Sequence, residues 1–163
     1  MFREMRRRRQ QLSEEECRRI LERGKTGVLA VVGDGGYPYT VPINYYFDGE
    51  SIYLHCAKEG HKLDAIKKEP KVSFCVVDRD DICQEKYTTL FRDVVVFGRA
   101  EIVTDEKEMR TSVTALAEKY CPDFLDGIPA EVEREFGILC MIKINIEHIT
   151  GKQGKELLKE DVR

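Results

Sequence analysis

Residues 26–56 read TGVLAVVGDGGYPYTVPINYYFDGESIYLHC and contain three β-like runs separated by two turns. The runs are rich in β-branched and aromatic residues, and the turns are GDGG and DGE. Short glycine-containing turns between such runs join antiparallel neighbours. The segment therefore predicts a three-stranded antiparallel meander over 26–32, 37–47 and 51–56.

Two prolines, Pro38 and Pro42, lie in the middle run of this meander. Proline has no backbone N–H and is tolerated in strands mainly at edges and bulges. We therefore expect the ladder to be interrupted over Val41, Pro42, Ile43 and Asn44. Such an interruption would leave backbone polar groups free to meet a ligand.

Segments on either side of the meander add helices and further strands. Ser13 followed by Glu16 is a capping box that predicts a helix over 13–23, and a helix over 60–68 ends before Pro70. The other expected elements are strands over 71–77, 88–103 and 138–149, a helix over 105–120, a loop or short helix over 129–136, and a polar connection over 78–86. About six mostly antiparallel strands with few outer helices favour a mainly β fold, a closed or split β-barrel.

The length of 163 residues predicts one domain, with a basic segment and helix over 1–24 and a polar tail over 151–163. The net charge of −3 gives the domain no strong positive field for nucleic acid. Its apolar runs are far shorter than the roughly 20 residues of a membrane span, and the start lacks the apolar core of a signal peptide. We expect a cytoplasmic protein that does not cross a membrane.

Cysteine, histidine and motif patterns exclude several chemistries. The six cysteines contain no C-x-x-C pair, so we expect reduced thiols that mostly fill the core. The three histidines are too scattered for a metal site. Hydrolase and kinase functions have no support, since G-x-S-x-G, P-loop, H-E-x-x-H and G-x-G-x-x-G motifs are absent.

The stretch from His55 to Lys62 places a glycine between a strand and a helix. Gly60 opens the helix, so His61 and Lys62 stand in its first turn, where free backbone N–H groups favour a phosphate. An ordinary polar cap and a solvated lysine explain the same residues. The pattern is compatible with both a phosphate site and an ordinary helix cap, and it does not identify a ligand.

A second polar group precedes the most apolar strand. Thr88 and Thr89 supply hydroxyls, and Arg92 supplies a planar fork that suits phosphate. The alternative is an ion pair of Arg92 with Asp93 or with an outer helix.

Several stretches in register resemble the flavin-binding split-barrel proteins of the pyridoxamine 5'-phosphate oxidase-like superfamily, and within it the Nim (5-nitroimidazole resistance) group. They are YPYTVPINY at 37–45, IYLHCA at 52–57, GHKLD at 60–64, FRDVVVFGRA at 91–100 and ITGK at 149–152. The resemblance runs from Met5 to Lys152, nearly the whole chain.

The resemblance implies a six-stranded antiparallel split β-barrel that forms a homodimer with FMN in grooves between the subunits. It implies that Val41, Pro42, Ile43 and Asn44 lie along the isoalloxazine ring, that His55, Cys56 and Ala57 contact ring or ribityl, that His61 and Lys62 hold the phosphate, and that Thr88, Thr89 and Arg92 close the site. Two features depart from the family. Asp93 replaces a usual serine, and the C-terminal signature of true pyridoxamine-phosphate oxidases is missing.

The leading function is therefore an FMN-dependent reductase that takes electrons from a small-molecule donor and passes them to nitro compounds or a similar small acceptor. His55 is the candidate acid or base because histidine titrates near neutral pH; a structural hydrogen bond is its alternative role. A non-catalytic flavin- or haem-binding protein, with His55 or His61 on the iron, is the competing function. Nucleic-acid binding by Arg6 to Arg9 is not expected, because acidic residues follow and aromatic interleaving is lacking. The resemblance implies that these arginines serve the fold or the flavin neighbourhood.

Overall fold

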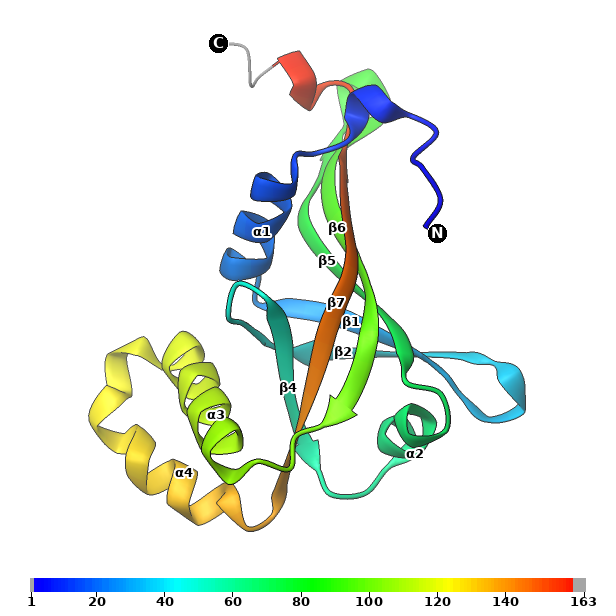
Figure 1. Cartoon of the computed structure of the whole chain (residues 1–163). Coiled ribbons are helices and arrows are strands. Elements are labelled where there is room, and N and C mark those ends of the chain that lie inside the picture. Colours follow the sequence, from blue (N-terminus) through cyan, green and yellow to red (C-terminus); the bar gives the residue numbers. More distant parts are fainter. Residues whose placement is uncertain (1, 160–163) are drawn as a thin grey trace.

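The fold is a single antiparallel sheet that curls into a split barrel with helices outside it (Figure 1); the computed structural model describes residues 2–159. The strands are β1 (Thr26–Val32), β2 (Pro38–Asn44), β3 (Tyr46–Phe47), β4 (Ser51–Ala57), β5 (Lys71–Cys83), β6 (Thr88–Ile102) and β7 (Leu139–Gln153). The helices are α1 (Glu14–Arg23), α2 (His61–Lys68), α3 (Glu106–Tyr120) and α4 (Ile128–Phe136). The strand order is β2-β1-β5-β6-β7-β4-β3, and the mainly β split-barrel prediction is confirmed.

The sheet has seven strands instead of six because the middle run of the meander divides at Tyr45. Tyr45 is fully buried, its hydroxyl donates to the Leu21 carbonyl at 2.8 Å, and its N–H donates to the Tyr120 hydroxyl at 3.0 Å. These bonds replace ladder bonds at the division.

The expected interruption at Val41–Asn44 is wrong. β2 pairs with β1 without a register shift, and Pro42 lies opposite Val28. β2 is an edge strand, where a missing N–H on the outer side costs no ladder bond. The prolines therefore mark a sheet edge and do not break the ladder.

The core follows from the alternation of the strands. In β1, Leu29 and Val31 point inward and are buried, whereas Val28 and Ala30 point outward and are half-buried. α1 packs on β6 and β7 and buries Cys17, Ile20 and Leu21 in the main core. Its N-cap is Ser13, whose hydroxyl accepts from the Glu16 N–H at 3.2 Å as the capping box predicts. α3 and α4 cover a second, smaller core on the other face of β4 and β7.

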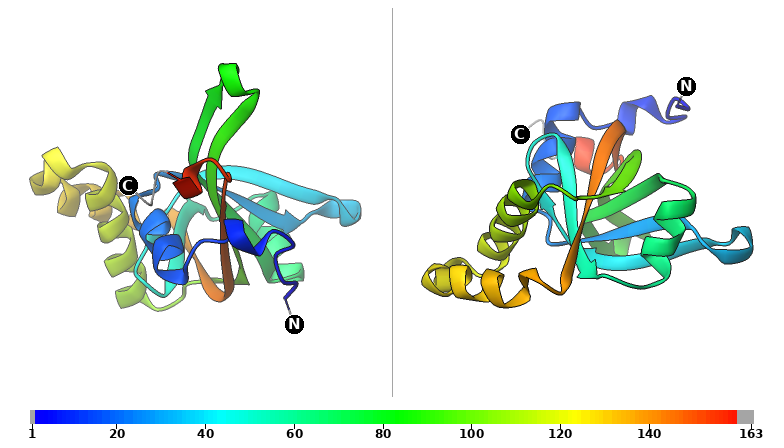
Figure 2. Two further views of the ribbon diagram at one scale, coloured as in Figure 1. Left: turned by 90° about the horizontal axis from the view of Figure 1, so that it is seen from above. Right: turned by 60° about the horizontal axis from the view of Figure 1, so that its bottom comes forward.

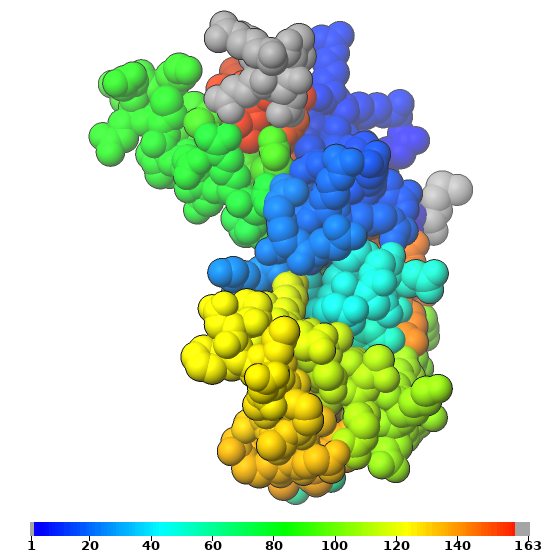
Figure 3. Space-filling view, turned by 90° about the vertical axis from the view of Figure 1, so that its left-hand side faces the viewer, coloured from blue at the N-terminus to red at the C-terminus, as the bar shows by residue number. Residues whose placement is uncertain are grey.

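Two strands are longer than expected. β5 continues to Cys83 through the stretch expected to be a polar connection, so it forms with β6 a hairpin that projects from the body (Figures 2 and 3). A register shift between Val77 and Arg79 bends this hairpin. β7 continues to Gln153, beyond the expected start of the polar tail, and Leu157 is buried. Residues 160–163 of that tail lie outside the described residues.

Candidate functional site

The start of α2 offers an open cradle beside the end of β4. Gly60 precedes the helix with φ 137° and ψ 161°, and no atom comes within 4 Å of the position that a Cβ would take there. This backbone conformation favours glycine. The first-turn N–H groups of a helix lack intrahelical partners, so they can donate hydrogen bonds to an anion at this point.

His61 is held by its neighbours instead of facing this cradle freely. Its Nε2 accepts from the Asp34 N–H at 3.3 Å, and its ring stacks on Tyr39 with the centroids 4.2 Å apart. Lys68 Nζ donates to the Asp34 carboxylate at 3.0 Å. His61 thus fastens α2 to the turn between β1 and β2, and Lys62 is left as the cation for an anion at the helix start.

Lys62 shares its surroundings with Cys56. Burial raises the pKa of the Cys56 thiol to about 11, the Lys62 charge lowers it, and proximity to Cys140 raises it. Cys56 is half-buried and packs against the main core. The structure therefore brings together two of the predicted site residues, Cys56 and Lys62.

His55 projects from the opposite face of β4. Successive side chains of a strand alternate, so His55 shares its face with Tyr53, which lies in the core under α3 and α4. His55 itself is exposed, as is Ala57 at the end of the strand. The predicted acid or base thus does not lie on the same face as Cys56 and Lys62.

Residues 41–44 of β2 also divide between two faces. Val41 and Ile43 are half-buried, and Ile43 packs against the main core, whereas Pro42 and Asn44 are exposed. The Asn44 side-chain amide donates to the Lys25 carbonyl at 2.9 Å. β2 contacts β4, so this strand borders the region of Cys56 and Lys62.

Three further predicted residues, Thr88, Thr89 and Arg92, lie in the β5–β6 hairpin, far from α2 at the other end of the barrel (Figure 1). Arg92 Nε donates to Gln153 Oε1 at 3.0 Å, and its Nη1 lies 3.8 Å from Asp78 and 3.9 Å from Glu16. Glu16 belongs to α1, so the predicted alternative of an ion pair with an outer helix is confirmed. A single chain does not bring these residues to Lys62.

An uncovered apolar sheet face lies on the outside of β1, β5 and β6, and sequence reasoning did not identify the residues that form it. We name it the outer sheet face; its central residues are Val28, Ala30, Cys75, Val95 and Phe97. The register places Cys75 opposite both Val28 and Val95. The signal was present in the sequence, because outward positions of an exposed strand are normally polar.

Other groups border the outer sheet face. Phe2 stacks on His148 with the centroids 4.6 Å apart, and 5.4 Å separate the centroids of Phe2 and Phe97. Asp93 is flanked by Val77 and by Lys152 in the register. Burial raises the pKa of the Asp93 carboxyl, and Lys152 opposes this shift. A negative charge at position 93 is thus disfavoured by its own surroundings.

The described part of the chain shows neither a cluster of metal-ligating side chains nor a membrane-spanning helix. Within residues 2–159, no three His, Cys, Asp or Glu side chains converge as metal ligands do. Over the same residues, no helix combines the length and the apolar character that crossing a bilayer requires.

Comparison with known proteins identifies the family. The pyridoxamine 5'-phosphate oxidase family model matches residues 13–153, which include every strand of the sheet. The chain belongs to the pyridoxamine 5'-phosphate oxidase family. No curated protein matches the sequence.

Several solved structures share the split-barrel fold of this member of the pyridoxamine 5'-phosphate oxidase family. A putative 5-nitroimidazole antibiotic resistance protein from Bacteroides thetaiotaomicron matches with a TM-score of 0.72 and 19% identity, covering 87% of this chain and 85% of the other. A FAD-binding protein from Mesorhizobium loti matches at 0.65 and 25% identity, covering 89% and 97%. The FAD and heme binding protein from Mycobacterium smegmatis matches at 0.74 and 20% identity, covering 90% and 74%.

Proposed function

We propose that this protein is a flavin-dependent reductase that binds FMN and passes electrons to nitro compounds or a similar small acceptor. The observation that carries the proposal is the open start of α2, where Gly60, first-turn N–H groups and Lys62 meet beside β4. This combination suits the phosphate of FMN. Family membership and the relatives described as FAD-binding support a flavin as the ligand.

The residues around that cradle have distinct roles in the proposal. Lys62 and the backbone of the first turn of α2 bind the phosphate, while Cys56 and the exposed edge of β2 border the isoalloxazine ring. His61 positions α2 through Asp34 and Tyr39. The bound flavin supplies the electron chemistry, and the protein supplies binding, orientation and the polarity around the ring.

A second copy of the chain completes the proposed site. Thr88, Thr89 and Arg92 lie too far from α2 to contribute within one chain. A second copy packed on the outer sheet face brings the same three residues of its own hairpin toward the start of α2. The exposed apolar surface of that face supports such a homodimer. The proposed flavin then lies between the subunits.

Lys62→Ala tests the phosphate contact. Removing a charge-assisted bond to phosphate is expected to weaken FMN binding by about 1.5–3 kcal/mol, or roughly 10- to 150-fold. Fluorescence titration of the flavin-free protein measures this change. Lys67→Ala, an exposed lysine in the last turn of the same helix, is the matched control and should leave affinity unchanged.

Riboflavin, which lacks the phosphate, should bind Lys62→Ala and the unaltered protein equally. An unchanged FMN affinity in Lys62→Ala would move the phosphate elsewhere. The visible spectrum of the loaded protein tests the competing function, because a Soret band would indicate haem. Anaerobic titration with NADH and NADPH, followed by a nitro compound, tests turnover; a flavin that no donor reduces would contradict the reductase proposal.

A further inference from the structure

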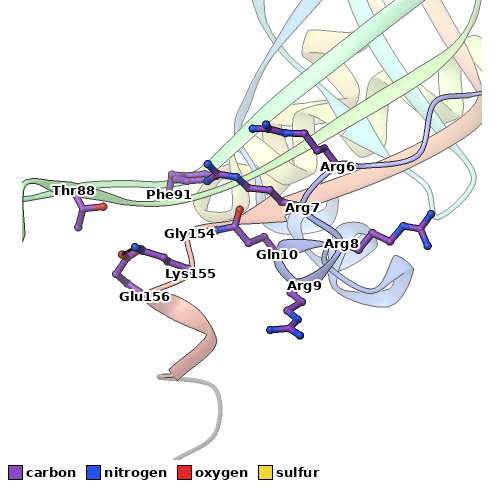
Figure 4. A pocket seen from close by; sticks show the side chains of 10 residues that line it. All are labelled: Arg6, Arg7, Arg8, Arg9, Gln10, Thr88, Phe91, Gly154, Lys155 and Glu156. Carbon is purple, nitrogen blue, oxygen red and sulfur yellow. Dashed lines mark ion pairs between the residues drawn. The ribbon is translucent and has the colours of Figure 1, made fainter.

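A basic pocket lies where residues 6–10 meet residues 154–156, at the end of the molecule away from α2 (Figures 1 and 4). Its volume is about 670 Å³, within the range of roughly 300–1,000 Å³ for small-molecule sites. Its lining comprises Arg6, Arg7, Arg8, Arg9, Gln10, Thr88, Phe91, Gly154, Lys155 and Glu156. We name it the N-terminal pocket.

The segment that supplies the arginines is anchored to the sheet. A short 3-10 helix spans Arg8–Gln10, and the Gln10 N–H donates to the Arg7 carbonyl at 2.9 Å. Gln11 then bridges to Lys152 of β7, and the Leu12 N–H donates to the Gly151 carbonyl at 2.9 Å. The arginines are therefore presented by ordered backbone packed on β7.

The charged side chains that line the N-terminal pocket are mostly positive. Five of its lining side chains are cationic, and its one acidic residue, Glu156, lies 3.8 Å from Lys155. Arg8 is paired with Glu4. In Figure 4, Arg7 extends toward Phe91, while Arg8 points away. Arg7 and Lys155 line the pocket from the two chain segments that form it, so an anion between these segments contacts both.

Gln10 is an independent sign that the pocket takes a ligand. Its side chain lies on the pocket wall, the residue is only 7% exposed, and Oε1 has no hydrogen-bond partner within residues 2–159. A buried polar atom without a partner costs about 1–3 kcal/mol. A ligand with an N–H or O–H group would remove this cost.

We propose that the N-terminal pocket binds a nucleoside diphosphate. Arg7 and Lys155 take the phosphates, Gln10 Oε1 accepts from an N–H or O–H of the ligand, and the Phe91 ring packs on the base. The net charge of −3 disfavours a nucleic-acid polymer. The proposal goes beyond the flavin function and uses none of the residues at the start of α2.

Calorimetric titration of the full chain with ADP tests the proposal. Arg7→Gln is expected to weaken ADP binding at least tenfold, and Gln10→Leu about fivefold or more. Arg19→Gln is the matched control, because Arg19 is an exposed arginine on α1 that pairs with Glu15 outside the pocket. Arg7 is exposed, so its substitution leaves the core intact.

Further ligands identify the groups that are recognised. Pyrophosphate should bind more weakly than ADP, adenosine should bind at least tenfold more weakly, and added salt should reduce ADP affinity. Saturating FMN should not displace ADP, and Lys62→Ala should leave ADP binding unchanged. Absence of ADP binding at millimolar concentration, equal effects of Arg7→Gln and Arg19→Gln, or competition with FMN would overturn the proposal. None of these outcomes depends on whether the α2 cradle binds flavin.

Discussion

At the scale of single residues, Lys119 on α3 bears its charge where water is largely excluded. Its Nζ lies 4.2 Å from the centre of the Tyr45 ring, and within residues 2–159 it has no hydrogen-bond partner. Burial lowers the pKa of the Lys119 ammonium to about 8 from 10.5. Between these values the unfolded chain binds more protons than the folded one, so the free energy of unfolding contributed by this group rises with pH.

Lys119→Met should therefore stabilise the protein at pH 7, where the buried lysine is still charged. The expected gain is roughly 1–2 kcal/mol after loss of the cation–π contact, and it should shrink toward pH 10. Denaturant unfolding at both pH values measures it, with Lys107→Met on the exposed side of the same helix as the control. A gain that is the same at pH 7 and pH 10 would show that desolvation of the charge is not its cause.

At the scale of elements, the pairing of β4 with β7 places Cys56 directly opposite Cys140. Both side chains belong to the barrel interior, which raises the pKa of the Cys56 thiol to about 11. A thiol reacts with alkylating agents as the thiolate. We expect iodoacetamide to modify Cys56 slowly at pH 7.5 and about tenfold faster for each added pH unit up to pH 10.

Peptide mapping by mass spectrometry follows this reaction residue by residue. Cys121 is exposed and serves as the control within the same chain. It should be modified first at pH 7.5. Equal rates for Cys56 and Cys121 at that pH would contradict the buried environment of Cys56.

The elements also show what the sequence could predict. The capping box located the start of α1, and β-branched runs located the strands, because both signals depend on neighbouring residues. The extension of β5 to Cys83 was missed, since Asp78, Asp80 and Asp81 read as a loop. Asp80 and Asp81 pair with β6 and Asp78 lies at the register shift, and local composition does not encode this pairing.

The candidate site was less predictable than the fold, because it too depends on contacts between residues that are distant in sequence. Adjacent positions such as His55 and Cys56 point to opposite faces of a strand, so a motif along the chain does not specify which members meet. The place of Arg92 depends on Glu16 and Gln153, which are distant in sequence. The contact of His61 with Asp34 likewise depends on how α2 packs on the β1–β2 turn.

At the scale of the whole molecule, the outer sheet face predicts the oligomeric state. Phe97 is 37% exposed and Val77 is 60% exposed on this apolar side of the sheet. Sedimentation equilibrium should therefore give about twice the chain mass of 18.9 kDa. Val95→Lys should shift the mass to that of one chain, because a buried interface disfavours an unpaired charge.

Ile138→Lys is the control for this substitution. Ile138 is a 64% exposed apolar residue before β7, outside the outer sheet face, so its replacement should leave the dimer intact. A mass of 18.9 kDa for the unaltered protein at micromolar concentration would contradict both the dimer and a flavin site between subunits.

The two edges of the sheet determine how copies of the chain can meet in a crowded solution. β2 carries Pro38 and Pro42 and therefore offers few N–H groups to an incoming strand, while β3 has only two residues, Tyr46 and Phe47. Prolines and very short strands at the edge are the features by which natural sheets resist aggregation through strand addition. The prolines of β2 and the shortness of β3 therefore disfavour strand addition at the two ends of the strand order, and with it the first step of amyloid-like stacking there.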